Sequence, residues 1–328
     1  MVSTRNEKLE NELNNYKNIQ LRESIRMGYN DFAEHYASIG LLSHALKFYT
    51  SSRDYLTIPI HILEMCNNII EISLEMDNYS NINTFILKAN QVVASPEKQM
   101  YMNKFTAVSG LMHLKNSQFK QAALKFLEVP FDIAPKLWSF IAAKDIALYA
   151  GLTALASFDR NDLKSKILEN QNFKNFLELE PQIRELIKAF YHSKFTNCFE
   201  IMANMQYDLT LDYFLSKHVS TLYTHIKNKA VLQYCSPFLS IDMHQMAKVF
   251  DTTVETLEEQ VVSLITDNQL DARIDSQNKV IRANTTNERS QVYAQSLQLG
   301  KEFQQKTRFM LLRSKMIQSG IYLKADRK

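Results

Sequence analysis

The N-terminal half of the chain repeats one pattern of small and large residues at helical spacing. Ala45, Ile82 and Ala122 occupy equivalent places in three consecutive copies, 37 and 40 residues apart. Each copy predicts two helices joined by a short turn, with small residues where the paired helices approach and aromatic residues between neighbouring pairs. One further helix is expected before the first copy, because Leu9 and Leu13 fall on one helical face.

A helical hairpin cannot cover its own apolar face, so successive hairpins are expected to stack into a solenoid. The period is close to that of tetratricopeptide-like (TPR-like) repeats, and we expect an array of this kind over residues 1–172. Small residues are dense from Tyr149 to Ala156, which predicts close packing between helices. Gly151 has no second glycine and no Lys-Ser/Thr pair nearby, so this run is not expected to hold phosphate.

The pattern changes within residues 236–284. Two amphipathic helices, separated by cap-forming residues, precede two short alternating runs with hairpin turn chemistry between them. This order of elements predicts a winged helix. The helices are expected at residues 241–250 and 254–268, the strands at 270–274 and 279–281, and the turn at 275–278.

A last helix is expected from Glu288 to about Ser319. Its apolar residues recur at steps near seven and form one stripe, which needs a partner surface. From residue 287 to the end, nine basic residues stand against three acidic ones, and a solvated basic face is the simplest interpretation of that surplus. The stripe consists of Val292, Leu299, Phe303, Met310 and Ile317.

The predicted fold class is mainly α, a TPR-like helical-repeat solenoid followed by a winged-helix domain with a small β-hairpin and a C-terminal helix. The expected domains are residues 1–172 (helical repeats), 173–284 (a helical part, 173–235, and the winged helix, 236–284) and 285–328 (C-terminal helix and tail).

A winged helix raises the possibility of nucleic-acid binding, and its charge opposes that function. Residues 236–284 contain four cations and eight anions, a net charge of −4, and the second helix carries Glu255, Glu258 and Glu259 without Lys or Arg. Contacts to phosphate dominate nucleic-acid affinity, so an acidic face is repelled. Association with other proteins, through the hairpin edge and the helix faces, is the favoured use of the fold.

Composition and residue spacing give no indication of an enzyme. The net charge is +3, 45% of the residues are apolar, and no run approaches the length of a membrane span. The polar N-terminus is not expected to be a secretory signal. Cys66, Cys198 and Cys235 are expected to be buried, reduced thiols. No His-x-His or His-Glu-x-x-His spacing occurs, and His218 and His225 are expected to be packing or surface residues. Catalytic, cofactor and metal sites are therefore all predicted to be absent.

Short segments along the chain carry a resemblance to a known family. They lie at residues 22–28, 40–47, 52–55, 157–160, 176–182, 222–230, 233–237, 242–247 and 300–304. Together with the order of helical array, winged helix and C-terminal helix, they resemble the PCI domain family and, within it, the family of COP9 signalosome subunit 1. The homologous proteasome lid subunits share the architecture and some of these elements.

The resemblance implies a non-catalytic scaffold subunit in the cytoplasm and nucleus, with neither nucleic acid nor membrane as a partner. In that family the winged helices pack edge to edge and the C-terminal helices form a bundle. The complex removes a ubiquitin-like modifier from cullins (deneddylation) through a JAMM zinc metalloprotease on another chain. The implied partners are other PCI subunits (subunits 2 and 3), the JAMM/MPN subunits and, indirectly, cullin-RING ubiquitin ligases.

Two alternatives remain, a scaffold subunit of the proteasome lid and an RNA-associated PCI protein. The candidate interface lies on the hairpin edge and the last helix, because an exposed strand edge and an isolated apolar stripe both invite partners. Its expected residues are Arg273, Asp275, Lys279, Val280, Arg282, Leu299, Phe303, Met310 and Ile317.

Overall fold

The computed structural model describes residues 2–93, 96–132, 140–284 and 288–321. The described chain is mainly helical and divides into two compact units. The first unit runs to Tyr234 and includes Val249–Asp251, and the second contains Cys235–Lys248 and the residues from Thr252 onward. The predicted fold class, helical repeats followed by a winged helix and a last helix, is confirmed.

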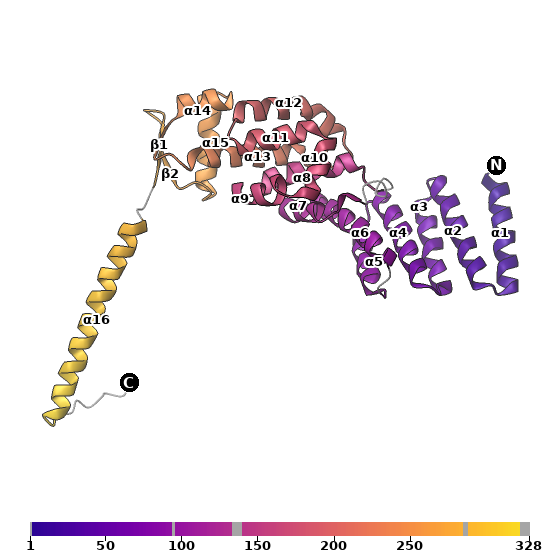
Figure 1. The fold of residues 1–328 in the computed structure, drawn as a ribbon, viewed down its shortest axis with the longest axis horizontal. Helices are drawn as coiled ribbons and strands as arrows, with labels where there is room; N and C mark the ends of the chain where they lie inside the picture. Colours follow the sequence, from indigo (N-terminus) through magenta and orange to yellow (C-terminus); the bar gives the residue numbers. More distant parts are fainter. Residues whose placement is uncertain (1, 94–95, 133–139, 285–287, 322–328) are drawn as a thin grey trace. The chain divides into compact units, whose positions relative to one another are not determined.

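The first unit is built from antiparallel helices that stand side by side (Figure 1). Its elements are α1 (Val2–Ile19), α2 (Arg22–Ser38), α3 (Leu42–Ser51), η1 (Ser52–Tyr55), α4 (Pro59–Glu75), α5 (Tyr79–Gln91), α6 (Pro96–Lys115), α7 (Phe119–Leu127), α8 (Ala143–Ser157), α9 (Arg160–Asp162), η3 (Leu163–Leu168), α10 (Gln171–Leu179), α11 (Pro181–Tyr191), α12 (Phe195–Leu211) and α13 (Val219–Cys235), whose last residue belongs to the second unit.

The three predicted hairpins are the pairs α2/α3, α4/α5 and α6/α7. Ala45, Ile82 and Ala122 each lie in the second helix of a pair and are fully buried. Aromatic residues fill the first pair, where the ring of Phe48 lies 5.0 Å from Phe32 and 5.2 Å from Tyr36. These rings pack within one hairpin, whereas the sequence pattern predicted aromatic residues between neighbouring hairpins.

Each of these hairpins turns at one residue with a left-handed backbone. In each turn the following N–H donates to the carbonyl five residues earlier, which satisfies a carbonyl at the helix end. The same turn also joins α11 to α12, a fourth copy that the sequence pattern did not predict. The turn residues are Gly40 (φ 83°), Asp77 (57°), Ser117 (59°) and Ser193 (58°), and the bonds run from Leu41 to Tyr36, Asn78 to Ser73, Gln118 to His113 and Lys194 to Ala189.

Close helix packing around Gly151 is confirmed. A Cβ atom at this position of α8 would lie 2.5 Å from a methyl group of Ile183 on α11, nearer than real Cβ contacts come. Gly110 of α6 is equally confined, since its Cβ would lie 2.7 Å from the ring of Phe126 on α7. Both glycines are required by the distance between helices.

The second unit contains the winged helix and the last helix. Its three strands form an antiparallel sheet in the order β1-β3-β2. The strand β1 replaces the first turn of the helix expected from residue 241. Asp242 ends the strand and accepts a 2.9 Å hydrogen bond from the backbone N–H of His244, so α14 begins later than predicted. The elements are β1 (Ser240–Asp242), α14 (Met243–Phe250), α15 (Val254–Thr266), β2 (Ala272–Asp275), β3 (Val280–Ala283) and α16 (Glu288–Gln318).

Candidate interaction surface

The sheet of the winged helix has one buried and one exposed face. Ala272 and Ile281 are buried and Ile274 is half-buried, whereas Arg273 and Arg282 are exposed. Alternation along β2 and β3 accounts for this division, because successive side chains of a strand point to opposite faces.

Four of the predicted interface residues share the exposed face. Arg273 lies directly opposite Arg282, and Asp275 lies opposite Val280. Directly opposite residues of an antiparallel pair share a face of the sheet. On its other side β3 pairs with β1, where Ser240 faces Arg282 and Asp242 faces Val280. The exposed face thus spans all three strands.

The strand order changes the expected docking edge. Lys279, Val280 and Arg282 were expected at an open edge, but β3 is the central strand and pairs on both sides. Its backbone is therefore not free to add a further strand. Of the predicted residues, only Arg273 and Asp275 lie on an edge strand. The other edge is β1, a strand of three residues that the sequence pattern did not reveal.

The hairpin is braced by its own polar side chains. Asp275 accepts hydrogen bonds from the backbone N–H of Asn278 (3.2 Å) and from its side-chain amide (2.9 Å), and the bonds to Asn278 lower the pKa of Asp275. Lys279 forms a 2.7 Å ion pair with Glu258 of α15, which also accepts from Ser276. Hydrogen bonds from Lys279 and Ser276 lower the pKa of Glu258.

These contacts separate the predicted charged residues into two groups. Asp275 and Lys279 are committed to the hairpin and to α15. Arg273 and Arg282 are exposed and take part in no ion pair within the described residues, although Arg282 helps to lower the pKa of Asp275. The two arginines are therefore cations that this face offers to a partner.

The helix α16 (Figure 1, yellow) has exposed apolar side chains along its length. The predicted residues Leu299, Phe303, Met310 and Ile317 are between 51% and 73% exposed. Phe309, Leu311 and Leu312 lie outside the predicted stripe and are also exposed. The helix is thus apolar on several faces around Met310, a property of helices that are buried by neighbours.

The outer side of α15 is acidic, as predicted. Glu255, Glu258 and Glu259 line an open hollow of about 550 Å³ together with Val262, which is 48% exposed, and Ser263. This is the helix that would enter a DNA groove in a nucleic-acid-binding winged helix. Its carboxylates would meet phosphates there, which disfavours such a use.

The cysteines and histidines considered as candidates for catalysis or metal binding have structural roles. Cys66, Cys198 and Cys235 are free and buried, as predicted, and burial raises the pKa of their thiols to about 11, 12 and 11. The rings of His218 and His225 contact the edge of Phe119 at centroid distances of 6.2 and 5.8 Å. Within the described residues, no group of three metal-binding side chains occurs, and no helix is long and apolar enough to cross a membrane.

Two family descriptions match the chain. Residues 2–166 match the family described as 26S proteasome subunit RPN7. Residues 171–285 match the PCI domain. The second match spans the helices α10 to α13 and the whole winged helix.

Individual relatives carry the names of two assemblies. The chain is 45% identical to COP9 signalosome complex subunit 1 of Arabidopsis thaliana, over 98% of this chain and 73% of that protein. It is 40% identical to subunit 1b of Drosophila melanogaster, over 97% and 62%. It is 25% identical to 26S proteasome non-ATPase regulatory subunit 6 of Caenorhabditis elegans, over 82% and 67%.

Proposed function

Because the chain belongs to the COP9 signalosome subunit 1 family, we propose that it is a non-catalytic scaffold that assembles with other subunits of that complex. The exposure of α16 carries the proposal. A helix of 31 residues with Phe303 and Met310 each more than 70% exposed gains stability once neighbours cover it. A bundle with the last helices of other PCI subunits provides that cover.

The winged helix supplies the second contact of the proposed scaffold. Its two edge strands, β1 and β2, present unpaired backbone groups, which a strand of a neighbouring subunit can satisfy. Arg273 and Arg282 add two cations to the exposed face. We infer that a neighbouring PCI subunit pairs with one edge and places carboxylates against these arginines.

In this proposal the chemistry belongs to another chain. The complex removes a ubiquitin-like modifier from cullins of cullin-RING ligases through its JAMM metalloprotease subunit, and this chain holds subunits such as 2 and 3 in place. The proposed location is the cytoplasm and nucleus. The proposed division of the chain is residues 1–172, 173–284 and 285–328, and the gap between the two family matches, at 167–170, supports the first boundary.

A scaffold role in the proteasome lid is the second candidate, because the N-terminal family match and the subunit 6 relatives point to it. The higher identity to the signalosome relatives, 45% against 25%, favours the first candidate. An RNA-associated role is third, and the acidic side of α15 opposes it.

Purification of the tagged chain from its own cells, with mass spectrometry of the bound proteins, tests the proposal. Recovery of further PCI subunits, a JAMM metalloprotease and a cullin supports the signalosome. Recovery of proteasome base and lid subunits would assign the chain to the lid instead. Recovery of messenger-bound or ribosomal proteins would favour the RNA-associated role.

A further inference from the structure

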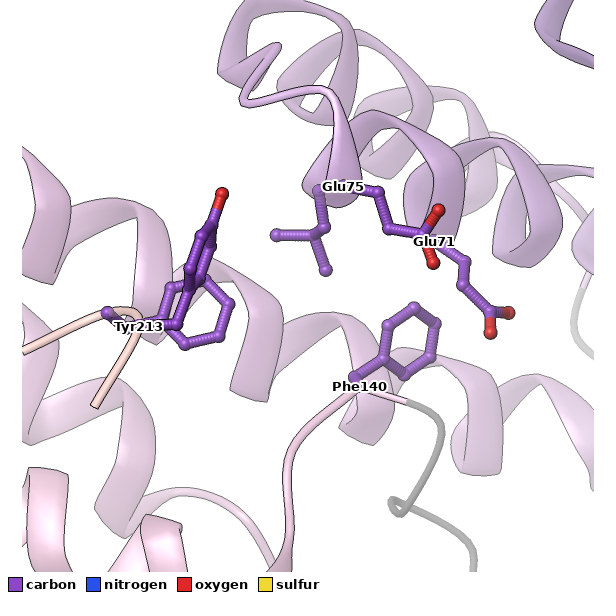
Figure 2. Close-up of a pocket in the computed structure, with 6 residues that line it drawn as sticks. Glu71, Glu75, Phe140 and Tyr213 are labelled. Carbon is purple, nitrogen blue, oxygen red and sulfur yellow. The ribbon is translucent and has the colours of Figure 1, made fainter. Parts of the chain in front are cut away.

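A pocket of about 350 Å³ lies in the first unit (Figure 2). It brings together residues from α4 and from two segments far along the chain, just before α8 and just after α12. Figure 2 shows Tyr213 on one side of the opening, and Glu71, Glu75 and Phe140 on the other. The lining residues are Glu71, Leu74, Glu75, Phe140, Tyr213 and Phe214.

The aromatic wall formed by Tyr213 and Phe214 is held in place by its surroundings. The two rings meet edge to face with centroids 5.0 Å apart, and Phe214 contacts the buried ring of Tyr149 in the same way at 6.4 Å. Asp212 accepts from the backbone N–H of Phe214 at 2.8 Å and from the Tyr149 hydroxyl, also at 2.8 Å. Tyr213 is 63% exposed, yet its neighbours are fixed.

Neighbouring contacts also fix the position of Tyr213. The ring of Tyr213 packs edge to face on Phe214, and its hydroxyl lies near Asp77, whose pKa is lowered first by hydrogen bonds from Tyr79 and Lys115. Lys115 forms a 3.1 Å ion pair with Asp77 and is thereby engaged outside the pocket. The ring of Tyr213 is thus held at the opening before any ligand binds.

The charge of the lining is negative. Glu71 and Glu75 lie one turn apart on α4, and no lysine or arginine is among the described lining residues. Burial and the charge of Glu75 raise the pKa of Glu71, and Lys104 of α6 offsets this only in part. None of the described lining residues is a cation that could pair with these two carboxylates inside the pocket.

We propose that this pocket binds a single cationic side chain, arginine or lysine, from a partner protein. Cations are attracted to the faces of aromatic rings, and Phe140, Tyr213 and Phe214 provide three such rings. The carboxylates of Glu71 and Glu75 supply the opposite charge. A guanidinium suits the pocket best, because its planar group stacks on a ring and donates to carboxylates together.

The dimensions and donors favour a side chain over other cations. The volume is at the low end of the range of small-molecule pockets, so it fits one long side chain. A metal ion would require a group of at least three His, Cys, Asp or Glu ligands, and the described residues contain none. The proposal does not depend on the interface of the winged helix and α16, which lies in the other unit.

Titration of the full-length chain with Nα-acetyl-arginine amide and with its neutral isostere Nα-acetyl-citrulline amide tests the proposal. Saturation-transfer difference NMR reports on binding of each probe. We expect the arginine probe to bind at least about tenfold more tightly than citrulline, since citrulline is neutral and has a carbonyl oxygen in place of one NH2 group. We also expect added salt to weaken binding of the arginine probe.

Three variants make the test specific. Glu71→Gln with Glu75→Gln removes the charge, and Tyr213→Ala removes a ring that is already exposed, so this second variant is expected to fold. Glu7→Gln with Glu10→Gln, on the exposed side of α1, is the matched control for the lost charge. Both pocket variants are expected to bind the arginine probe at least about fivefold more weakly than the unaltered chain does. The control is expected to bind the probe with unchanged affinity.

Any one of three results would overturn the proposal. The first is equal binding of the arginine and citrulline probes, and the second is no saturable binding of either probe. The third is an α1 control that weakens binding as much as the pocket variants do. Thermal unfolding of every variant accompanies the titration. A change in affinity is interpreted only for variants that unfold at the same temperature as the unaltered chain. If the double variant unfolds at a lower temperature, Tyr213→Ala provides the test.

Discussion

Arg273 and Arg282 lie directly opposite each other on neighbouring strands, with both side chains on the exposed face of the winged-helix sheet. Like charges in this arrangement destabilise an antiparallel pair. No described carboxylate forms an ion pair with either arginine, which leaves both available to a partner. We propose that the pair stabilises the assembly at a small cost to the isolated domain.

Replacing Arg273 with Glu is expected to have opposite effects on the chain and on the complex. An opposite-charge pair with Arg282 stabilises the isolated chain by about 0.2–1 kcal/mol. The same change places a carboxylate where the partner is expected to have its own, so less of the chain enters the complex. Chemical denaturation and co-purification measure the two effects.

The control for this variant is Lys47→Glu on α3, which makes the same charge change at an exposed position of the first unit. It should leave co-purification unchanged. Unaltered assembly of the Arg273→Glu variant would remove the sheet face from the proposed interface.

Substitution of Gly151 tests the close packing of α8 on α11. The added methyl of Gly151→Ala would overlap Ile183, and overpacking of this kind costs about 1–3 kcal/mol. Gly300 of α16 has no atom near its Cβ position, so Gly300→Ala adds about 0.5–1 kcal/mol of helix stability instead. Thermal unfolding followed by circular dichroism distinguishes the two. Equal unfolding temperatures for both variants would contradict the packing described for α8.

The pair Lys279–Glu258 predicts a dependence of stability on pH. The folded-state pKa of Glu258 is lowered, chiefly by the hydrogen bond from Lys279. Its contribution is therefore present above the unfolded-state pKa of glutamate and is lost as pH falls through the folded-state pKa. In Lys279→Met the pKa of Glu258 should rise.

NMR titration of the Glu258 side chain measures this change directly. Lys248→Met, at an exposed position of α14, is the matched control and should leave the pKa of Glu258 where it is. A Glu258 pKa that is the same in Lys279→Met and in the unaltered chain would contradict the 2.7 Å ion pair.

The three cysteines are expected to be unreactive while the chain is folded. Burial raises their thiol pKa values to about 11 or 12, so little thiolate exists near neutral pH. A thiol reagent should therefore label them only in denaturant. Rapid labelling of any of the three in the native chain at neutral pH would show that the residue is accessible.

Local sequence patterns were sufficient for the repeats. Buried residues recur at equivalent places in the three hairpins, because the contact between two adjacent helices sets their spacing. These residues are Ala45, Ile82 and Ala122. The winged helix was recognised for the same reason, since caps and a hairpin turn are local signals. The exposed stripe of α16 was also visible in the spacing of its apolar residues.

What the sequence did not reveal depends on contacts between distant segments. The strand β1 has three residues and one apolar side chain, Ile241, and only its pairing with β3 identifies it. This pairing made β3 central and moved the open edges to β1 and β2. The pocket joins Glu71 to Tyr213 across the fold, and no spacing along the chain encodes that approach. The turn at Ser193 was missed because serine gives no strong signal for a left-handed backbone.

We propose that α16 enters the complex through its apolar stripe. A variant with Phe303→Asp and Met310→Asp tests this proposal when its co-assembly with the other subunits is measured. Both side chains are exposed, so the isolated chain should unfold at an unchanged temperature. Gln305→Asp is the control, because it adds a carboxylate on the opposite side of the same helix. We expect the double variant to be lost from the purified complex while the control is retained. Retention of the double variant at the level of the control would contradict it.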